Sequence, residues 1–358
     1  MIHILRTLKQ EFFFTGEFML RKIFTLIFIT TAAFSAISCN KKNTSSTDEK
    51  EITLVMAEVN PAESIAGQMD QAFKEKVEEL SGGKIKINLQ CSGILGDVDS
   101  VMDLMMKPNS TIHIHRMSAV NMAMYGCKKS SLLSIPFTFS SKEHFWRFAN
   151  SELGQEILEE PIEAGLGLRG LFFGEEGFRH FFSTKKIEKI EDFEGLNVRG
   201  TNDKAMQGVL KGLKANSVPV NYADLYGALQ TGVIDAAEQP IANYLTNHFN
   251  SIAPYMILDG HTLGVMEAVI TEECWASLTK EQQDILIEAG KYASEFCRKL
   301  SQTEEDKIKD ALIEAGATLT EVKNVEPWQN ACAEVIQESA SVDYVLYHSI
   351  LNYARAKK

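Results

Sequence analysis

The sequence predicts an α/β fold, because short apolar strands alternate with amphipathic helices from residue 52 onward. The first alternation, over residues 52–117, reads strand, helix, strand, helix, strand, which is typical of a mostly parallel sheet. A second alternation follows between Leu168 and Tyr244. The chain has 358 residues, 45% of them apolar and 23% charged, which is ordinary for a globular protein and allows two domains.

The elements of the first alternation have clear boundaries. A strand is predicted over residues 52–57, followed by a helix whose apolar residues share one face: Ile65, Met69, Phe73, Val77 and Leu80. Ser81-Gly82-Gly83 ends this helix, because glycine adopts the left-handed conformation that closes a helix at little cost. Further strands are predicted from Ile85 and over residues 111–117, and a helix over residues 97–106 lies between them.

Two polar residues, Glu58 and Asn60, follow the first predicted strand. Open α/β sheets bind ligands beyond the carboxyl ends of their strands, so both side chains are candidates for ligand contacts. Glutamate and asparagine are also common turn and capping residues, and this alternative stays open.

The second alternation begins with a predicted strand over residues 168–173 and a predicted loop over residues 174–183. A short strand then ends at Arg199, with Leu196 and Val198 on one face and Asn197 on the other face with Arg199. Next come a helix with an apolar stripe at Met206, Val209, Leu210 and Leu213, a strand at SVPV, a second helix, and the segment GVIDAAEQP (Gly232–Pro240).

Arg199 is placed well to bind a carboxylate. It ends a strand, and Thr201-Asn202-Asp203 supplies N-cap residues for the helix that follows. A guanidinium matches two carboxylate oxygens, and the N-terminus of a helix adds favourable partial charge. Many arginines at strand ends only cap a neighbouring element, so a structural role is the alternative.

Charge and motifs exclude several classes of protein. A net charge of −12 argues against a nucleic-acid surface. The segment Gly165–Gly170 satisfies G-x-G-x-x-G, but a helix precedes it and a strand follows, which is the reverse of a dinucleotide site, so we interpret it as a helix end and turn. Neither a nucleophile elbow nor a phosphate-binding loop is present, so the sequence does not predict an enzyme, and no cofactor is expected.

Histidines and cysteines do not predict a metal centre. His113 and His115 lie on one face of a predicted strand, but no third ligand has suitable spacing, so we predict no metal site. Apart from Cys39, the scattered Cys91, Cys127, Cys274, Cys297 and Cys332 form no C-x-x-C motif. We expect them to be mostly buried as small apolar residues.

Residues 1–38 have the features of an export signal. Arg21-Lys22 precedes an uncharged apolar run over residues 23–38 that is short for a membrane span. The run ends before Cys39, and a polar tether extends over residues 39–50. This arrangement resembles a bacterial lipoprotein signal, with Cys39 as the lipidated residue. An uncleaved membrane anchor is the alternative, and either Met1 or Met19 could be the start.

Several motifs in order resemble the solute-binding proteins of TRAP transporters, the DctP-like family. They cover residues 52–320 and comprise ELSGGKIKI, SGILGD, SIPFTF, GFRHFFS, FEGLNVRG and ADLYGALQTGVIDAAEQP. The resemblance implies that Arg199 makes the main salt bridge to a ligand carboxylate and that Arg179 is a second anion contact. Gln239 stands where the family usually has a ligand-binding asparagine. Arg116 and Ser118 lie in a segment that departs from the family pattern, and both are carried as pocket candidates beside Glu58 and Asn60.

The resemblance also implies the architecture: a two-lobed fold of the periplasmic-binding-protein type, with hinge strands and one long helix spanning both lobes. Lobe I would hold residues 51–171 with a return segment over residues 264–358, and lobe II would hold residues 172–263. Apolar spacing places the long helix at about residues 279–316, with two consecutive helices as the alternative. Residues after Glu326 are expected to be helical and to pack on the outside.

The implied function is transport rather than catalysis. The chain is expected to be a lipid-anchored, extracytoplasmic and monomeric protein that captures an organic acid and delivers it to a TRAP membrane permease. Glu58 in the pocket favours a hydroxylated sugar acid, such as a hexuronate, over a plain fatty acid. A dicarboxylate, another monocarboxylate, and a metal-binding or sensory protein of the same fold are the alternatives.

Overall fold

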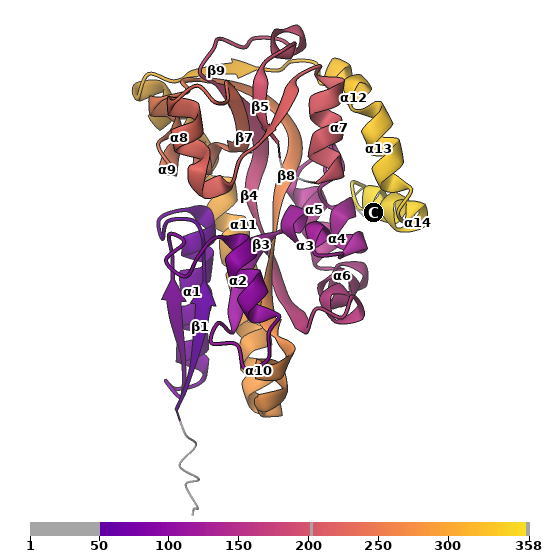
Figure 1. Cartoon of the computed structure of the whole chain (residues 1–358). Helices are drawn as coiled ribbons and strands as arrows, with labels where there is room; N and C mark the ends of the chain where they lie inside the picture. Colours follow the sequence, from indigo (N-terminus) through magenta and orange to yellow (C-terminus); the bar gives the residue numbers. More distant parts are fainter. Residues whose placement is uncertain (1–50, 201–202, 356–358) are drawn as a thin grey trace, which may run out of the picture. The chain divides into compact units, whose positions relative to one another are not determined.

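The computed structural model describes residues 51–200 and 203–355, and these residues build a mixed sheet with helices on both faces (Figure 1). The described part of the sheet has nine strands in the order β2-β1-β3-β8-β4-β7-β5-β6, and β9 pairs with β8. The strands are β1 (Ile52–Ala57), β2 (Ile85–Gln90), β3 (Ile114–Ser118), β4 (Leu168–Ser183), β5 (Asn197–Gly200), β6 (Asn216–Pro219), β7 (Ala236–Pro240), β8 (Tyr255–Thr271) and β9 (Thr318–Glu321).

Helices cover the sheet and connect its parallel strands. The α-helices are α1 (Ile65–Leu80), α2 (Val98–Met105), α3 (Ala119–Met124), α4 (Lys128–Leu132), α5 (Lys142–Ala149), α6 (Glu152–Glu163), α7 (Lys204–Gly212), α8 (Leu225–Gln230), α9 (Ile241–Thr246), α10 (Glu272–Ser277), α11 (Lys280–Glu314), α12 (Glu326–Ala331), α13 (Ala333–Ala340) and α14 (Tyr344–Asn352). Short 3-10 helices are η1 (Ile190–Phe193), η2 (Tyr222–Asp224) and η3 (Phe249–Ser251).

Two groups of parallel strands form the ends of the sheet. β1 pairs in parallel with β2 and β3 at one end, and β5 pairs in parallel with β6 and β7 at the other. The long antiparallel strands β4 and β8 connect the two groups, because β8 pairs with β3 and β4 pairs with β7. The predicted α/β fold is therefore confirmed, and the carboxyl ends of β1, β3, β5 and β7 define where a ligand would bind.

The prediction of a loop over residues 174–183 is wrong. These residues continue β4, which pairs with β8 through register shifts at Gly170/Phe172, Glu175/Phe178 and Arg179/Phe181. Local composition gave the wrong answer because two glycines and four charged or imidazole side chains are unusual in a buried strand. Here the bulges reorient the strand, and the polar side chains find partners inside the protein.

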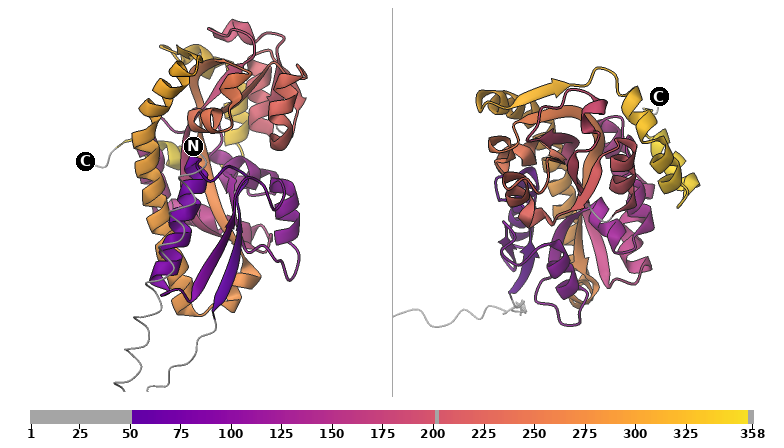
Figure 2. Two further views of the ribbon diagram at one scale, coloured as in Figure 1. Left: turned by 90° about the vertical axis from the view of Figure 1, so that its left-hand side faces the viewer. Right: turned by 45° about the horizontal axis from the view of Figure 1, so that its top comes forward.

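One continuous helix, α11, extends over 35 residues, so the alternative of two consecutive helices is wrong. Leu286 and Ala289 near its start pack in the core that contains α1, whereas Leu312 near its end packs in the core that contains α8 and α9. Figure 2 shows α11 beside α1. Gly290 allows the close approach of α11 to β4, because a Cβ there would lie 2.8 Å from a ring carbon of Phe172.

Several local predictions are confirmed. Gly82 and Gly83 have positive φ after α1, and Gly165 and Gly167 have positive φ between α6 and β4, as a helix end and turn require. Asp203 caps α7 by accepting a hydrogen bond from the Met206 N–H, at 2.9 Å. Cys127, Cys274, Cys297 and Cys332 are buried free thiols and Cys91 is half-buried. The C-terminal residues form α12 to α14, and the first of them packs with α13 against the core around α7.

The predicted signal segment, tether and lipidated Cys39 lie outside the described residues, as do Thr201 and Asn202 of the predicted cap. None of the helices in the described part of the chain is long and apolar enough to cross a membrane.

Candidate functional site

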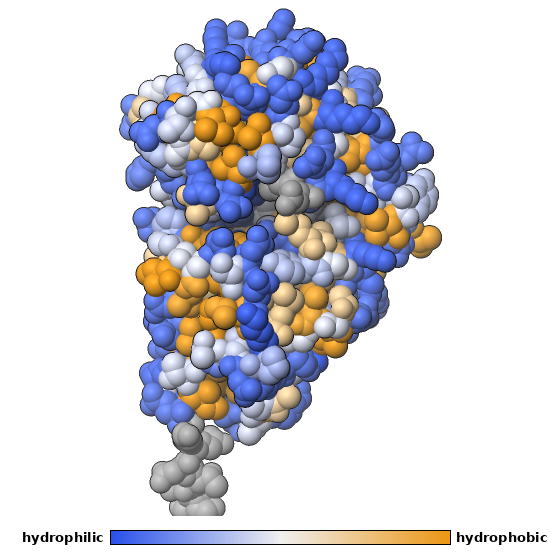
Figure 3. All heavy atoms as spheres, viewed as in Figure 1, coloured by the Kyte–Doolittle hydropathy of each residue, from blue (hydrophilic) through white to orange (hydrophobic). Residues whose placement is uncertain are grey.

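A pocket of about 490 Å³ lies at the carboxyl ends of the parallel strands. Its walls come from the segments after β1 and β3, from the middle of β4, and from the ends of β5 and β7. Figure 3 shows a hollow at mid-height on this face, with hydrophilic side chains beside it. Five of the six predicted residues that line this pocket carry a charge or an amide, so the pocket suits a small polar ligand.

Arg116 is held by Glu58 in a buried ion pair. β1 and β3 are parallel with Ala57 opposite His115, so the next residues in register, Glu58 and Arg116, are neighbours. Arg116 Nε donates to Glu58 Oε2 at 2.6 Å, and a second guanidinium nitrogen donates to Oε1. Burial acts to raise the pKa of Glu58, but the adjacent guanidinium outweighs burial and the pKa lies below its usual value. Arg116 lines the pocket, whereas Glu58 lies behind the wall and is only 1% exposed.

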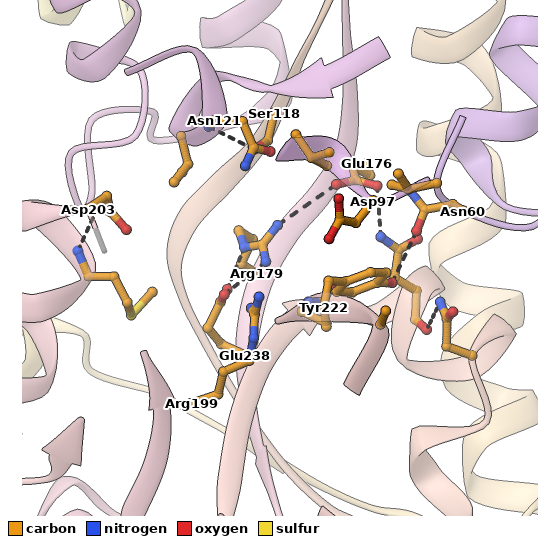
Figure 4. Close-up of a pocket in the computed structure, with 18 of the residues that line it drawn as sticks. Asn60, Asp97, Ser118, Asn121, Glu176, Arg179, Arg199, Asp203, Tyr222 and Glu238 are labelled. Atoms are coloured by element: carbon orange, nitrogen blue, oxygen red, sulfur yellow. Dashed lines mark hydrogen bonds and ion pairs between the residues drawn. The ribbon is translucent and has the colours of Figure 1, made fainter. Parts of the chain in front are cut away.

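Asn60 extends this pair to the opposite wall. Its backbone N–H and its side-chain amide both donate to Glu58 Oε1, at 2.6 and 3.0 Å. Its own side-chain oxygen accepts a hydrogen bond of 3.1 Å from the Tyr222 hydroxyl, which comes from the segment after β6. A polar chain therefore connects Arg116 through Glu58 and Asn60 with Tyr222, and Figure 4 shows its last contact, between Asn60 and Tyr222.

Arg179 is also paired within the protein. Phe181 on β4 lies opposite Glu238 on β7, so Arg179, two residues before Phe181, is the diagonal neighbour of Glu238 on the same face. Arg179 Nε donates to one oxygen of Glu238, and another nitrogen donates to the second oxygen at 2.8 Å. Burial acts to raise the pKa of Glu238, but Arg179 and His261 lower it below its usual value.

His261 lies between Asp259 and Glu238 and adds a positive charge beside the Arg179–Glu238 ion pair. Its Nδ1 lies 2.7 Å from Asp259 Oδ2, and its Nε2 lies 3.6 Å from Glu238 Oε2. Burial acts to lower the pKa of His261, but the two carboxylates outweigh burial and raise it to about 9, so the imidazole is protonated at neutral pH. Glu238 therefore lies between two cations, Arg179 and His261.

Arg199 differs from the other two pocket arginines. Its Nε donates to the Val220 carbonyl at 2.9 Å, and its guanidinium carbon lies 6.0 Å from the centre of the Tyr222 ring. No carboxylate in residues 51–200 or 203–355 forms an ion pair with it (Figure 4). Burial lowers the pKa of Arg199, which is the direction expected for a cation withdrawn from water without a direct counter-ion.

The remaining predicted residues also face the pocket. Gln239 is 2% exposed and lines it, and its side-chain amide makes no hydrogen bond with the described residues. Ser118 lines the pocket as the N-cap of α3, accepting from the Asn121 N–H at 3.2 Å. The structure therefore brings Asn60, Arg116, Ser118, Arg179, Arg199 and Gln239 to one pocket and places Glu58 directly behind it.

Sequence reasoning missed four residues of this site. Tyr222 and Glu238 line the pocket and contact predicted residues, Glu176 lines it 3.8 Å from Arg179, and Asn243 donates to Glu176 at 2.8 Å. Glu238 lies inside the motif ADLYGALQTGVIDAAEQP, so its neighbour Gln239 was a signal. For Glu176, Tyr222 and Asn243, no local pattern distinguished them from loop and helix residues.

His113 and His115 have structural partners on β1. Nδ1 of His113 accepts from the Val55 N–H at 2.9 Å, and Nδ1 of His115 lies 2.9 Å from the Ala57 carbonyl. Within the part of the chain that the structure describes, no group of three or more histidine, cysteine or acidic side chains could hold a metal ion.

A mixed sheet with a polar pocket at its strand ends, and one pocket guanidinium without an ion-pair partner among the described residues, defines the class as a solute-binding protein. Residues 56–343 match the model of the bacterial extracellular solute-binding proteins, family 7, known as DctP. The chain belongs to this family, which is a transport family, and its members are periplasmic binding proteins.

Relatives of known name share low identity over most of the chain. The sialic acid-binding periplasmic protein SiaP of Vibrio cholerae is 23% identical, over 80% of this chain and 88% of its own. The 2,3-diketo-L-gulonate-binding periplasmic protein YiaO of Escherichia coli is 26% identical, over 68% of this chain and 73% of its own.

Solved structures support the same fold. A TRAP periplasmic solute-binding protein from Pseudomonas putida F1 with bound D-glucuronate has a TM-score of 0.81 at 24% identity, over 86% of this chain and 98% of its own. A TRAP periplasmic protein from a Bradyrhizobium species, in complex with galacturonate, has a TM-score of 0.78 at 25% identity, over 84% of this chain and 99% of its own. The predicted family and fold are therefore confirmed.

Proposed function

We propose that this protein captures a sugar acid and delivers it to a TRAP-type membrane permease. The observation that carries the proposal is Arg199: it is the one guanidinium lining the described pocket without a carboxylate partner in the described residues. A ligand carboxylate beside Arg199 would replace lost hydration with two charge-assisted hydrogen bonds. This is the role that the sequence resemblance implied.

Arg179 and Arg116 take supporting roles in this proposal. Both are already neutralised, by Glu238 and Glu58, so they donate to neutral oxygens of the ligand more readily than they compensate a second charge. Asn60, Gln239 and Ser118 supply further donors and acceptors for hydroxyl groups. Glu58 acts through Arg116 and Asn60 rather than by contacting the ligand itself.

A sugar acid agrees with what several relatives bind. Similar proteins hold D-glucuronate, galacturonate or galactonate, and a pocket of about 490 Å³ has room for a molecule of six carbons. A dicarboxylate is the second candidate, because the C4-dicarboxylate-binding protein DctP of Rhodobacter capsulatus is 22% identical over 75% of this chain.

Closure and membrane attachment complete the proposal. Lobe I would comprise residues 51–171 and 264–358, lobe II residues 172–263, and the lobes would close over the ligand about β4, β8 and α11. A lipid on Cys39 would tether the monomeric protein to the membrane outside the cytoplasm, where it would meet the permease. The protein would bind and release its ligand without catalysing a reaction.

Mass spectrometry of small molecules released from gently purified protein tests the proposal, with isothermal titration of the compound found. A co-purifying hydroxy acid or sugar acid that rebinds to refolded protein is the expected result. Failure of hexuronates, aldonates and dicarboxylates alike to bind ligand-free protein would refute it.

A further inference from the structure

The pocket has more arginines than unpaired positive charges, and this difference limits the number of carboxylates that a ligand can carry. The cations that line the described pocket are Arg116, Arg179 and Arg199, and the first two have buried carboxylate partners. Only Arg199 is left to compensate an incoming anion. The pocket can therefore neutralise one carboxylate with its own side chains.

Glu176 adds a negative charge to the same space. It is 4% exposed and lines the pocket from β4, and Asn243 Nδ2 holds its Oε2 at 2.8 Å. Its Oε1 lies 3.8 Å from Arg179 Nη1, beyond hydrogen-bonding distance, while Arg179 is engaged by both oxygens of Glu238. Figure 4 shows Glu176 on the other side of Arg179 from Arg199. Oε1 is thus a hydrogen-bond acceptor available to a ligand.

Carboxylates also stand at the ends of two helices that border the pocket. Asp97 caps α2 and Asp203 caps α7, and both residues line the pocket. Figure 4 shows Asp97 beside Glu176, so this part of the pocket offers carboxylate acceptors, which suit the hydroxyl groups of a ligand and repel a second carboxylate.

We propose that this pocket selects polyhydroxy acids with a single carboxylate, and that Glu176 is the residue that excludes diacids by accepting a hydrogen bond from a ligand hydroxyl. The inference rests on the proposed function, because it assumes that Arg199 binds the first carboxylate. A hydroxyl donates to Glu176 Oε1 and satisfies it, whereas a carboxylate at the same place leaves two like charges together in a site with little water.

Matched pairs of acids test the selection on the unaltered protein. D-gluconate against D-glucarate, and D-galactonate against galactarate, differ mainly in whether the terminal carbon carries a hydroxyl or a carboxylate. Titration calorimetry should show the monoacid binding at least about ten-fold more tightly in each pair that binds, because burying an uncompensated charge is costly. Equal or tighter binding of the diacids would overturn the inference.

The variant Glu176→Gln tests the residue. Glutamine keeps an oxygen for Asn243 and removes the charge, so the preference for the monoacid should shrink by about ten-fold while the monoacid itself loses less than about three-fold. Glu175→Gln is the matched control, because Glu175 is equally buried on the adjacent position and does not line the pocket. It should leave the preference unchanged, and an unchanged preference in Glu176→Gln would refute the role of Glu176.

The two proposals fail in different ways. Diacids that bind as tightly as the monoacids, and that lose this binding in Arg199→Ala, would leave the proposed function standing and refute the selection for one carboxylate. Absence of binding by every acid in the unaltered protein would refute the proposed function and the inference with it. The comparison of acid pairs in the unaltered protein remains decisive even where Glu176→Gln does not fold.

Discussion

Replacing Arg199 with methionine should abolish most ligand affinity without destabilising the ligand-free protein. Arg199 has no carboxylate partner among the described residues, so its removal leaves no carboxylate unpaired behind it. Arg116 is the matched contrast, because it also lines the pocket but is paired with the buried Glu58. Arg116→Met should destabilise the protein strongly.

The magnitudes follow from the contacts. Arg199→Met removes the hydrogen bond to the Val220 carbonyl and the contact with the Tyr222 ring, each worth about 0.5–2 kcal/mol. It also removes the desolvation cost of a half-buried cation, which has the opposite sign and a similar size. The net change in unfolding free energy should lie within about 1 kcal/mol of zero. Arg116→Met leaves Glu58 buried and unpaired, which typically costs about 3–5 kcal/mol.

The affinity of Arg199→Met for the ligand should fall by the free energy of the ion pair between Arg199 and the ligand carboxylate. Removing one partner of a buried charge pair typically costs about 2–5 kcal/mol, and every 1.4 kcal/mol is about ten-fold, so the dissociation constant should rise by at least about twenty-fold. Urea unfolding followed by tryptophan fluorescence, on protein unfolded and refolded to remove ligand, gives the stabilities, and titration calorimetry gives the affinities. Arg199→Met that destabilises as much as Arg116→Met, or that binds ligand normally, would refute the assignment of Arg199 as the unpaired cation.

Three further predictions concern other parts of the molecule. Burial raises the pKa of Glu267 on β8 to about 8, so the stability that this group contributes is present below about pH 4.5 and is lost as the pH rises through 8. Glu267→Gln should therefore flatten the pH dependence of the unfolding free energy, measured with urea between about pH 5 and 8. An unchanged slope would contradict this. Tyr222→Phe removes the hydrogen bond to Asn60 and should lower the unfolding free energy by about 0.5–1.5 kcal/mol, measured against wild type at the same pH; no loss would mean that water replaces the contact fully. Gly212→Ala should lower the unfolding free energy by about 1–3 kcal/mol, because a Cβ there would lie 2.0 Å from the Ala331 carbonyl oxygen. Gly227→Ala in α8 is the control: a Cβ there would have nothing within 4 Å, so this variant should be neutral or stabilising. Thermal melts of both variants measure the difference.

Much of the fold is predictable because it depends on local periodicity. The apolar face of α1 and the glycines that end it are properties of neighbouring residues, and the structure places both as the pattern predicts. The wrong prediction, a loop where β4 continues, shows where local periodicity is insufficient. Residues Gly174–Ser183 include two glycines and four charged or imidazole side chains, and they become a buried strand because β8 and β7 pair with them from distant parts of the chain.

In the site, too, some residues can be predicted from local sequence and others depend on distant parts of the chain. Arg199 could be predicted from its place at a strand end, and Glu58 and Asn60 from theirs, because the carboxyl ends of parallel strands meet at one edge. The orientation of Glu58 could not be predicted, since it depends on the register of β1 against β3, which brings Arg116 beside it. Tyr222 and Glu176 enter the pocket through the course of η2 and a bulged part of β4, and neither feature has a local sequence signal.

Counting arginines is therefore a poor guide to the charge of a ligand. A sequence with Arg116, Arg179 and Arg199 near one pocket suggests a site for two or three negative charges, and such a site would favour a dicarboxylate. Parallel register pairs Arg116 with Glu58, and the diagonal contact between β4 and β7 pairs Arg179 with Glu238. Because a buried guanidinium that already shares its charge stabilises another anion much less, the three arginines act as one cationic site with two polar walls. The charge that a ligand must carry is set by strand register, which decides which arginine is left without a partner.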